Sequence, residues 1–208
     1  MFDAALRPVI DRILDPLGRF LMRRNVTATS VTIIGFGFGL GAAVAVMFGA
    51  FFIAAMLIVV NRFCDGLDGA IARQAGPSDF GGYLDIVLDF IFYSSVPLGF
   101  ALYDAANAQA AAFLIFSFIG TGVSFLAYAI LAEKRGISTD IRGQKSFYYL
   151  GGLTEGAETI IFLIAICIWP SWFFHLACGF ALLCWITTVT RIHAAASLSD
   201  FFQPSNHP

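Results

Sequence analysis

Long apolar stretches recur along this sequence of 208 residues, and they constrain its fold more than any other feature. Each stretch approaches the roughly 20 residues that an α-helix needs to cross a bilayer. Very short links near Gly49 and Pro170 predict helical hairpins for the first pair and the last pair. Thr29 or Ser30 is the expected N-cap of the first helix. We expect six membrane-spanning helices, at about residues 29–49, 51–73, 81–104, 108–132, 154–170 and 172–193.

The composition excludes most other classes of protein. Hydrophobic residues make up 59% of the chain and charged residues 12%, whereas soluble domains carry roughly 45–50% apolar and 25% charged residues. The formal net charge of −2 gives no indication of a nucleic-acid partner. The four cysteines lie inside apolar runs without ligand spacing, so neither disulfides nor a zinc site is expected. We expect residues 1–208 to form a single all-α integral membrane domain.

The charged N-terminal segment predicts both an interfacial helix and the orientation of the protein. Apolar residues recur at helical spacing over about residues 2–24, as in an amphipathic helix that lies in the membrane surface. Five of the twelve basic residues precede the first span, and the 133–153 connection carries four more. The connections near residues 50, 104–108 and 170 carry none. We therefore expect both termini to face the cytoplasm.

Four carboxylates interrupt the apolar pattern at one end of the second and third spans. Asp65 and Asp68 are three residues apart, so they lie on one helix face. Asp85 and Asp89, four residues apart, also share a face. A short connection makes the two helices antiparallel, so we expect the pairs to face each other just inside the cytoplasmic boundary. Such acids would repel one another, and an all-oxygen site suits Mg²⁺ or Mn²⁺, two of which can clamp a phosphate.

Glycines beside these acids favour a ligand site, because they remove side chains where a bulky ligand could approach the backbone. They are Gly66, Gly69 and Gly81. Spacing alone leaves two other interpretations open. The acids could form a proton or cation relay, or they could form a structural charge cluster with arginines such as Arg62 and Arg73.

The sequence around the acids resembles the signature of the CDP-alcohol phosphatidyltransferase family. The matching run is Asp65-x2-Asp68-Gly69-x2-Ala72-Arg73-x7-Gly81-x3-Asp85-x3-Asp89. The segment between Arg73 and Gly81 is one residue shorter than the family usually has. The whole chain is similar to a bacterial inner-membrane branch of this family, which implies a multi-pass protein whose active site faces the cytoplasm.

The resemblance implies transfer of a phosphoalcohol group to an acceptor alcohol with release of CMP, usually from the donor CDP-diacylglycerol. Asp65, Asp68 and Asp85 would hold two Mg²⁺ or Mn²⁺ ions at the diphosphate. Asp89 would complete the metal site and take the proton of the acceptor hydroxyl. The residues that would contact the donor are Gly66, Gly69, Ala72, Arg73, Gly81, Thr29, Thr32 and Ser78. Family members are typically homodimers, so a homodimer is expected here.

The acceptor side is less defined by the sequence. Glu155 and Glu158 share a face at the start of the fifth span, where they either line the acceptor pocket or form salt bridges with nearby cations. Those cations, Arg142, Lys145 and Arg191, could instead bind a phosphorylated acceptor. Glycerol phosphate, serine, inositol phosphate and an existing phospholipid all remain open as acceptors. The rival functions are a cation or proton transporter that uses the same acids and a scaffold without activity.

Overall fold

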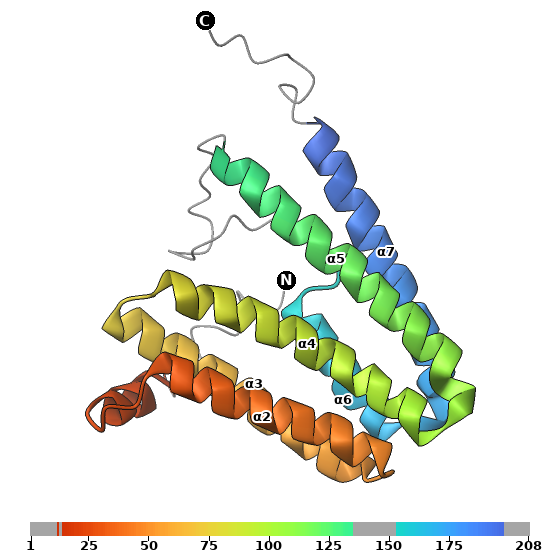
Figure 1. Ribbon diagram of the computed structural model, residues 1–208, viewed down its shortest axis with the longest axis horizontal. Helices are drawn as coiled ribbons and strands as arrows, with labels where there is room; N and C mark the ends of the chain where they lie inside the picture. The colour runs from red at the N-terminus through yellow and green to blue at the C-terminus, as the bar shows by residue number, and fades with distance from the viewer. Residues whose placement is uncertain (1–11, 13, 135–152, 198–208) are drawn as a thin grey trace, which may run out of the picture.

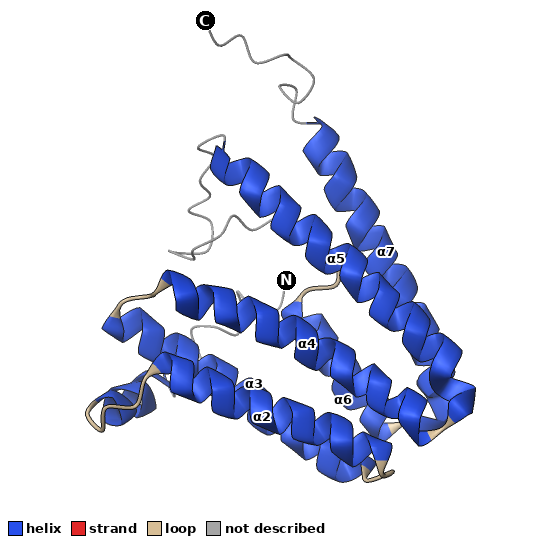
Figure 2. Ribbon diagram, viewed as in Figure 1, coloured by secondary structure: helices blue, strands red, loops and turns tan. Residues whose placement is uncertain are grey.

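A computed structural model of the protein describes residues 12, 14–134 and 153–197 (Figure 1). Every regular element in this part of the chain is a helix, as Figure 2 shows, so the predicted all-helical fold is confirmed. A short helix at residues 14–22 comes first. The helices that follow are α2 (Ala28–Met47), α3 (Phe51–Ala75), α4 (Asp79–Tyr103), α5 (Ala108–Lys134), α6 (Gly156–Ile168) and α7 (Phe173–Ser197). Two short 3-10 turns, η1 (Ala105–Asn107) and η3 (Pro170–Trp172), connect α4 to α5 and α6 to α7.

Four of the described helices are long and apolar enough to cross a membrane by length and composition. They are α2, α4, α5 and α7, with η1 and η3 leading into the last two. The helix α3 has 25 residues but carries two aspartates and two arginines from Arg62 onward. The helix α6 is apolar but has only 13 residues. It is shorter than the predicted span 154–170 because Glu155 caps its start and Trp169 leaves the helical conformation at its end.

A side-chain cap determines where α2 begins. Thr27 is extended, with φ −91° and ψ 154°, and its Oγ1 accepts a hydrogen bond of 3.2 Å from the backbone N–H of Ser30. The prediction of Thr29 or Ser30 as the N-cap was therefore wrong by two or three residues, and both lie inside the first turn of α2. A Thr at the extended position before a helix satisfies one of the free N–H groups of that turn.

The helix α2 packs against both α3 and α4, and α6 packs mainly on α3 (Figure 1). The helix α5 pairs with α7, and this pair diverges from α4 with distance from η1. Stacked aromatic rings fix the apolar core where the two groups meet. Phe100 of α4 stacks on Phe173 of α7 with ring centroids 4.2 Å apart, and Phe162 of α6 stacks on Phe180 of α7 at the same separation. At the opposite end of α4, beside its short connection to α3, Phe80 and Tyr83 stack outside this core with ring centroids 6.4 Å apart.

The short N-terminal helix packs on the bundle with part of its apolar face. Leu14 is buried, and Leu17 and Leu21 contact a small core formed by residues of α2 and α3. A Cβ on Gly66 of α3 would lie 2.7 Å from Leu14 Cδ1, so this glycine allows the close approach. The expectation that this face lies on lipid therefore differs from the structure at these leucines, because the ends of α2 and α3 offer them a protein surface. Of the predicted segment 2–24, residues 2–11 and 13 lie outside the described residues.

Gly39 allows α2 and α4 to approach closely, so a larger residue at this position should destabilise the protein. A Cβ at this position would lie 2.6 Å from Phe92 Cδ2, and Phe92 is 1% exposed. Gly39→Ala should therefore overpack this contact and lower the free energy of unfolding by about 1–3 kcal/mol. Thermal unfolding in detergent measures the effect. Gly37→Ala is the matched control, because a Cβ there meets nothing within 4 Å, and equal midpoints for the two variants would contradict the prediction.

Candidate functional site

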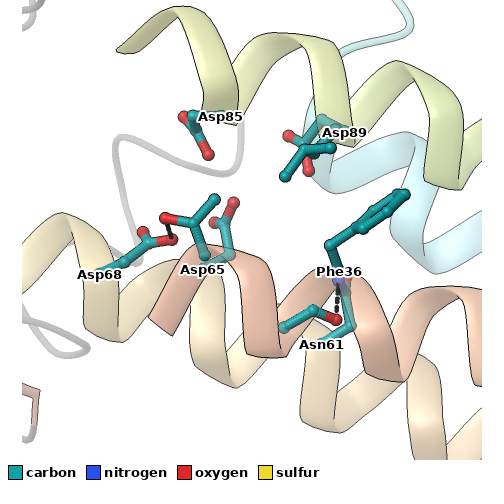
Figure 3. Close-up of a pocket in the computed structure, with 9 residues that line it drawn as sticks. Phe36, Asn61, Asp65, Asp68, Asp85 and Asp89 are labelled. Atoms are coloured by element: carbon teal, nitrogen blue, oxygen red, sulfur yellow. Dashed lines mark hydrogen bonds between the residues drawn. The ribbon is translucent and has the colours of Figure 1, made fainter. Parts of the chain in front are cut away.

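The acids of α3 and α4 meet in one pocket that α2 closes from the side (Figure 3). One carboxylate oxygen from each of Asp65, Asp85 and Asp89 lies within 4.8 Å of the other two, and all three residues are half-buried. The helical offsets place each pair of acids on one face, and α2, which packs against both α3 and α4, holds the two helices so that these faces meet. The lining residues are Thr32, Gly35, Phe36, Asn61, Asp65, Asp68, Asp85, Leu88 and Asp89.

Asp68 lines the same pocket but is held differently from the other acids. Its Oδ2 accepts a hydrogen bond of 2.6 Å from Thr32 Oγ1 of α2, and the residue is 7% exposed. Within the described part of the chain, the converging group of carboxylates consists of the other three acids. The sequence predicts that all four acids converge, whereas the structure separates Asp68 because Thr32 reaches it from a third helix.

The polar groups of the pocket fit a hard divalent cation. Asn61 Nδ2 donates a hydrogen bond of 2.9 Å to the Gly35 carbonyl, which fixes the amide so that Oδ1 is its remaining polar atom (Figure 3). This Oδ1 is buried and has no hydrogen-bond partner among the described residues. An unsatisfied buried acceptor costs about 1–3 kcal/mol, so a bound group that offers a proton or a positive charge would be stabilising. Carboxylate and amide oxygens are ligands that Mg²⁺ and Mn²⁺ accept.

An arginine and a tyrosine contact two of these acids from the side away from the α3–α4 connection. Arg62 forms an ion pair with Asp65, and its NH2 lies 3.9 Å from Asp89 Oδ1. The Tyr93 hydroxyl donates a hydrogen bond of 3.0 Å to Asp89 Oδ2 and accepts one of 3.4 Å from Arg62 NH1. Sequence reasoning named Arg62 as a counter-charge but missed Tyr93. The available signal was spacing, since Tyr93 follows Asp89 by four residues on the same helix face.

Arg73 lies at the end of α3, outside the pocket lining. It is exposed, and its NH2 is 3.5 Å from Asp15 Oδ1 in the N-terminal helix. A Cβ on Gly69, one turn earlier, would lie 3.3 Å from Arg73 NH1, so the two predicted donor-side residues are neighbours. The guanidinium is thus close to the chain surface near the pocket end of α3, rather than among the acids.

The other expected donor-side residues surround the same ends of α2, α3 and α4. Ser78 is the N-cap of α4, and its Oγ accepts a hydrogen bond of 3.1 Å from the Gly81 N–H. Gly66 faces Leu14 rather than the pocket, which gives it a packing role. Among these residues, Thr32 lines the pocket with the acids. Thr29 and Ala72 are half-buried on α2 and α3.

Glu155 and Glu158 form the capping box at the start of α6. The Glu155 N–H donates a hydrogen bond of 3.2 Å to Glu158 Oε2, and Glu155 is 5% exposed. Neither is part of the pocket lining. This helix start nevertheless lies beside Tyr93, which contacts Asp89, because a Cβ on Gly156 would be 3.7 Å from the Tyr93 hydroxyl.

Arg191 is buried between α7 and α5. Its NH1 donates a hydrogen bond of 3.0 Å to the Thr121 carbonyl, and its guanidinium lies 5.6 Å from the centre of the Phe125 ring. It does not line the acid pocket. Arg142 and Lys145, the other two predicted acceptor-side cations, lie outside the described residues.

Comparison with known sequences gives the same family as the signature around the acids. A family model described as CDP-alcohol phosphatidyltransferase matches residues 25–196. Inner membrane protein YnjF of Escherichia coli is 47% identical over 193 residues, which cover 92% of this chain and 94% of that protein. Archaetidylinositol phosphate synthase of Methanothermobacter thermautotrophicus is 30% identical over 160 residues, covering 76% of this chain and 73% of that enzyme.

Solved structures of one enzyme share the fold. The crystal structure of Mycobacterium tuberculosis phosphatidylinositol phosphate synthase (PgsA1) with CDP-DAG bound has a TM-score of 0.76 and 24% identity, covering 93% of this chain and 99% of that chain. The same enzyme in complex with manganese and citrate has a TM-score of 0.70 and covers 92% of this chain and 93% of that chain. At this identity the likeness establishes a common membrane fold. The group of three aspartates in the present chain is consistent with a divalent metal.

Proposed function

This chain belongs to the CDP-alcohol phosphatidyltransferase family, and on that premise we propose that it transfers a phosphatidyl group from CDP-diacylglycerol to an acceptor alcohol, with release of CMP. The observation that carries the proposal is the convergence of the Asp65, Asp85 and Asp89 carboxylates within 4.8 Å of one another. The CDP-DAG bound in the related PgsA1 structure supports the choice of donor.

In this proposal the four acids would hold two Mg²⁺ or Mn²⁺ ions, with Asp68 oriented by its hydrogen bond from Thr32. When bound, the metal ions would neutralise the diphosphate and the charge that develops on the departing CMP. Asp89 accepts the proton of the acceptor hydroxyl. The hydroxyl oxygen forms a bond to the phosphatidyl phosphorus while the bond from that phosphorus to the CMP oxygen breaks. CMP leaves with the bonding electron pair, so atoms and charge balance.

The donor side of the site follows the positions matched to the family signature. Arg73 presents a planar guanidinium that suits phosphate oxygens, and it is exposed near the end of α3. Gly69 beside it keeps the backbone accessible, since it has no side chain to fill the space next to the guanidinium. We assign the remaining contacts to the residues around these two, which are Ala72, Gly81, Thr29, Thr32 and Ser78, and not to Gly66, which packs against Leu14.

We further propose that the six helices α2–α7 all cross the membrane, with both termini and the acid pocket toward the cytoplasm. The uneven distribution of basic residues supports this orientation. The first half of α3 supports its assignment as a span, because Phe52, Ile53 and Met56 are exposed apolar residues suited to lipid contact. A homodimer is the assembly expected from the family.

Release of CMP from CDP-diacylglycerol by the detergent-purified protein tests the proposed reaction. We expect release that requires Mn²⁺ or Mg²⁺, stops with EDTA and is stimulated by one alcohol of a panel. Because one relative is an archaetidylinositol phosphate synthase, inositol phosphate should be tested first, followed by glycerol phosphate, serine and phospholipid. Sealed inverted vesicles should show the activity with a soluble acceptor added outside, and sealed right-side-out vesicles should not.

Two outcomes would contradict parts of this proposal. Absence of CMP release with every alcohol, together with Mn²⁺ or proton flux into proteoliposomes, would replace the transferase by a transporter that uses the same acids. Activity in both vesicle orientations with an intact permeability barrier would contradict the proposed direction of the pocket, while leaving the reaction itself in place.

A further inference from the structure

Arg62 and Tyr93 form a polar floor beneath the acid pocket. Arg62 precedes Asp65 by three residues on α3, and Tyr93 follows Asp89 by four residues on α4. Because α3 and α4 run antiparallel, both residues lie one turn farther from the α3–α4 connection than the acids they contact. The floor therefore lies between the acids and the apolar core, to which Tyr93 and Phe92 belong, and the Tyr93 ring contacts Phe92 and Phe90.

The two oxygens of Asp89 are engaged by two different groups of this floor. The Tyr93 hydroxyl donates to Oδ2 at 3.0 Å, while Arg62 NH2 is 3.9 Å from Oδ1. Arg62 also contacts the Tyr93 hydroxyl at 3.4 Å and forms an ion pair with Asp65. The hydrogen bond fixes the position of Oδ2, and the attraction of Oδ1 to Arg62 opposes rotation about the carboxylate axis, so the Asp89 carboxylate is oriented before any ligand arrives.

Burial restricts the groups with which the Tyr93 hydroxyl can form hydrogen bonds. Tyr93 is 7% exposed, and a buried tyrosine hydroxyl requires a hydrogen-bond partner. The start of α6 confines the hydroxyl from the other side, since a Cβ on Gly156 would lie 3.7 Å from it. The hydroxyl is thereby directed to Asp89 and Arg62 by its surroundings. Partners of this kind orient ligating carboxylates in metal sites, and their loss typically lowers metal affinity by about 10–100-fold.

We infer that Tyr93, braced by Arg62, is a positioning residue that fixes the Asp89 carboxylate for cation binding and for its role as the base. The role of Asp89 as the base rests on the proposed function, whereas its orientation for cation binding does not. Tyr93 does not touch the reacting atoms in this scheme. Its hydroxyl acts through Asp89, and its ring fills the core beneath the pocket.

Tyr93→Phe tests the inference, because it removes one oxygen and keeps the ring. We expect the affinity for Mn²⁺, measured from the electron paramagnetic resonance signal of the free ion, to fall about tenfold. At saturating Mn²⁺, kcat should fall about tenfold while KM for CDP-diacylglycerol changes little, since the donor-side residues are unaltered. Tyr83→Phe is the matched control, because Tyr83 is an exposed tyrosine of the same helix, and it should leave both quantities unchanged.

Arg62→Lys provides a second variant that keeps the charge but loses the planar fork. Its effect on Mn²⁺ affinity should be less than additive with that of Tyr93→Phe, because both changes release the same carboxylate. Full additivity would overturn the claim that Arg62 braces Tyr93. A lower thermal midpoint for Tyr93→Phe with wild-type Mn²⁺ affinity and kcat would reduce Tyr93 to a packing residue. Reduced Mn²⁺ affinity in a protein whose wild type releases no CMP would retain the positioning role for cation binding and reject the transfer reaction.

Discussion

Replacing Asp89 by Asn is expected to reduce CMP release by about 10²–10⁴-fold, the range attributed to a positioned general base. Asn has the same shape but cannot accept the proton of the acceptor hydroxyl. The protein should stay folded, since an amide oxygen can still accept the hydrogen bond from Tyr93 and Arg62 keeps its ion pair with Asp65. Initial rates of CMP release at saturating Mn²⁺ measure the loss.

Asp79→Asn is the matched control for this experiment. Asp79 lies in the first turn of the same helix, is exposed and is not part of the pocket lining, so the identical chemical change should leave the rate near that of the wild type. Full activity of Asp89→Asn would remove Asp89 as the base. Equal losses in the two variants would show that the assay reports damage to α4 rather than chemistry in the pocket.

The parts of the site that could be predicted from the sequence depend on local geometry. Helical spacing places Asp65 with Asp68 and Asp85 with Asp89, and a short connection allows only an antiparallel course for α3 and α4. These two constraints suffice to bring the acids to one end of the bundle. They act within about 25 residues of chain, so no knowledge of the remaining helices is needed.

The contacts that distinguish the acids from one another depend on how each helix is rotated about its axis. Close packing of small residues sets that rotation. A Cβ on Gly35 of α2 would lie 2.8 Å from Cys64 Cβ of α3, so α2 approaches α3 at this point and Thr32, three residues earlier, reaches Asp68. The sequence contains these residues but does not say which glycine meets which neighbour. For this reason Asp68 was expected to converge with the other three acids.

The role of Glu155 could not be predicted from the sequence for a different reason. A capping box usually begins with Ser or Thr, and Glu is not among the preferred N-caps. The sequence places Glu155 and Glu158 at the start of the fifth span and predicts either an acceptor-side role or salt bridges for them, but not a capping role. The structure shows both residues in the capping box, and places that helix start beside Tyr93. A structural role at the helix start and a place near the acceptor are compatible, because the first turn of α6 borders the pocket floor.

Asp65→Asn should weaken Mn²⁺ binding because Asp65 supplies one of three converging oxygens. Losing a residue that only orients a metal ligand typically lowers metal affinity by about 10–100-fold, so the loss of a ligand should lower it by at least this much. The metal-dependent binding of CDP-diacylglycerol should weaken with it. Isothermal titration with Mn²⁺ measures the first quantity, and retention of CDP-lipid on immobilised protein with Mn²⁺ or EDTA measures the second. Unchanged Mn²⁺ affinity would exclude Asp65 as a metal ligand.

A comparison with Asp85→Asn separates the ligand role of Asp65 from its ion pair. Both variants lose one carboxylate of the group, so both should lose most of the thermal stabilisation that Mn²⁺ gives by binding the folded state. In EDTA the thermal midpoints of the two variants should differ. Asp85→Asn relieves repulsion among the acids and leaves the ion pair of Arg62 with Asp65 intact. Asp65→Asn relieves the same repulsion but removes that partner, leaving Arg62 with Asp89 at 3.9 Å. Its midpoint in EDTA should therefore be the lower of the two, and the reverse order would mean that Arg62 does not stabilise the metal-free pocket.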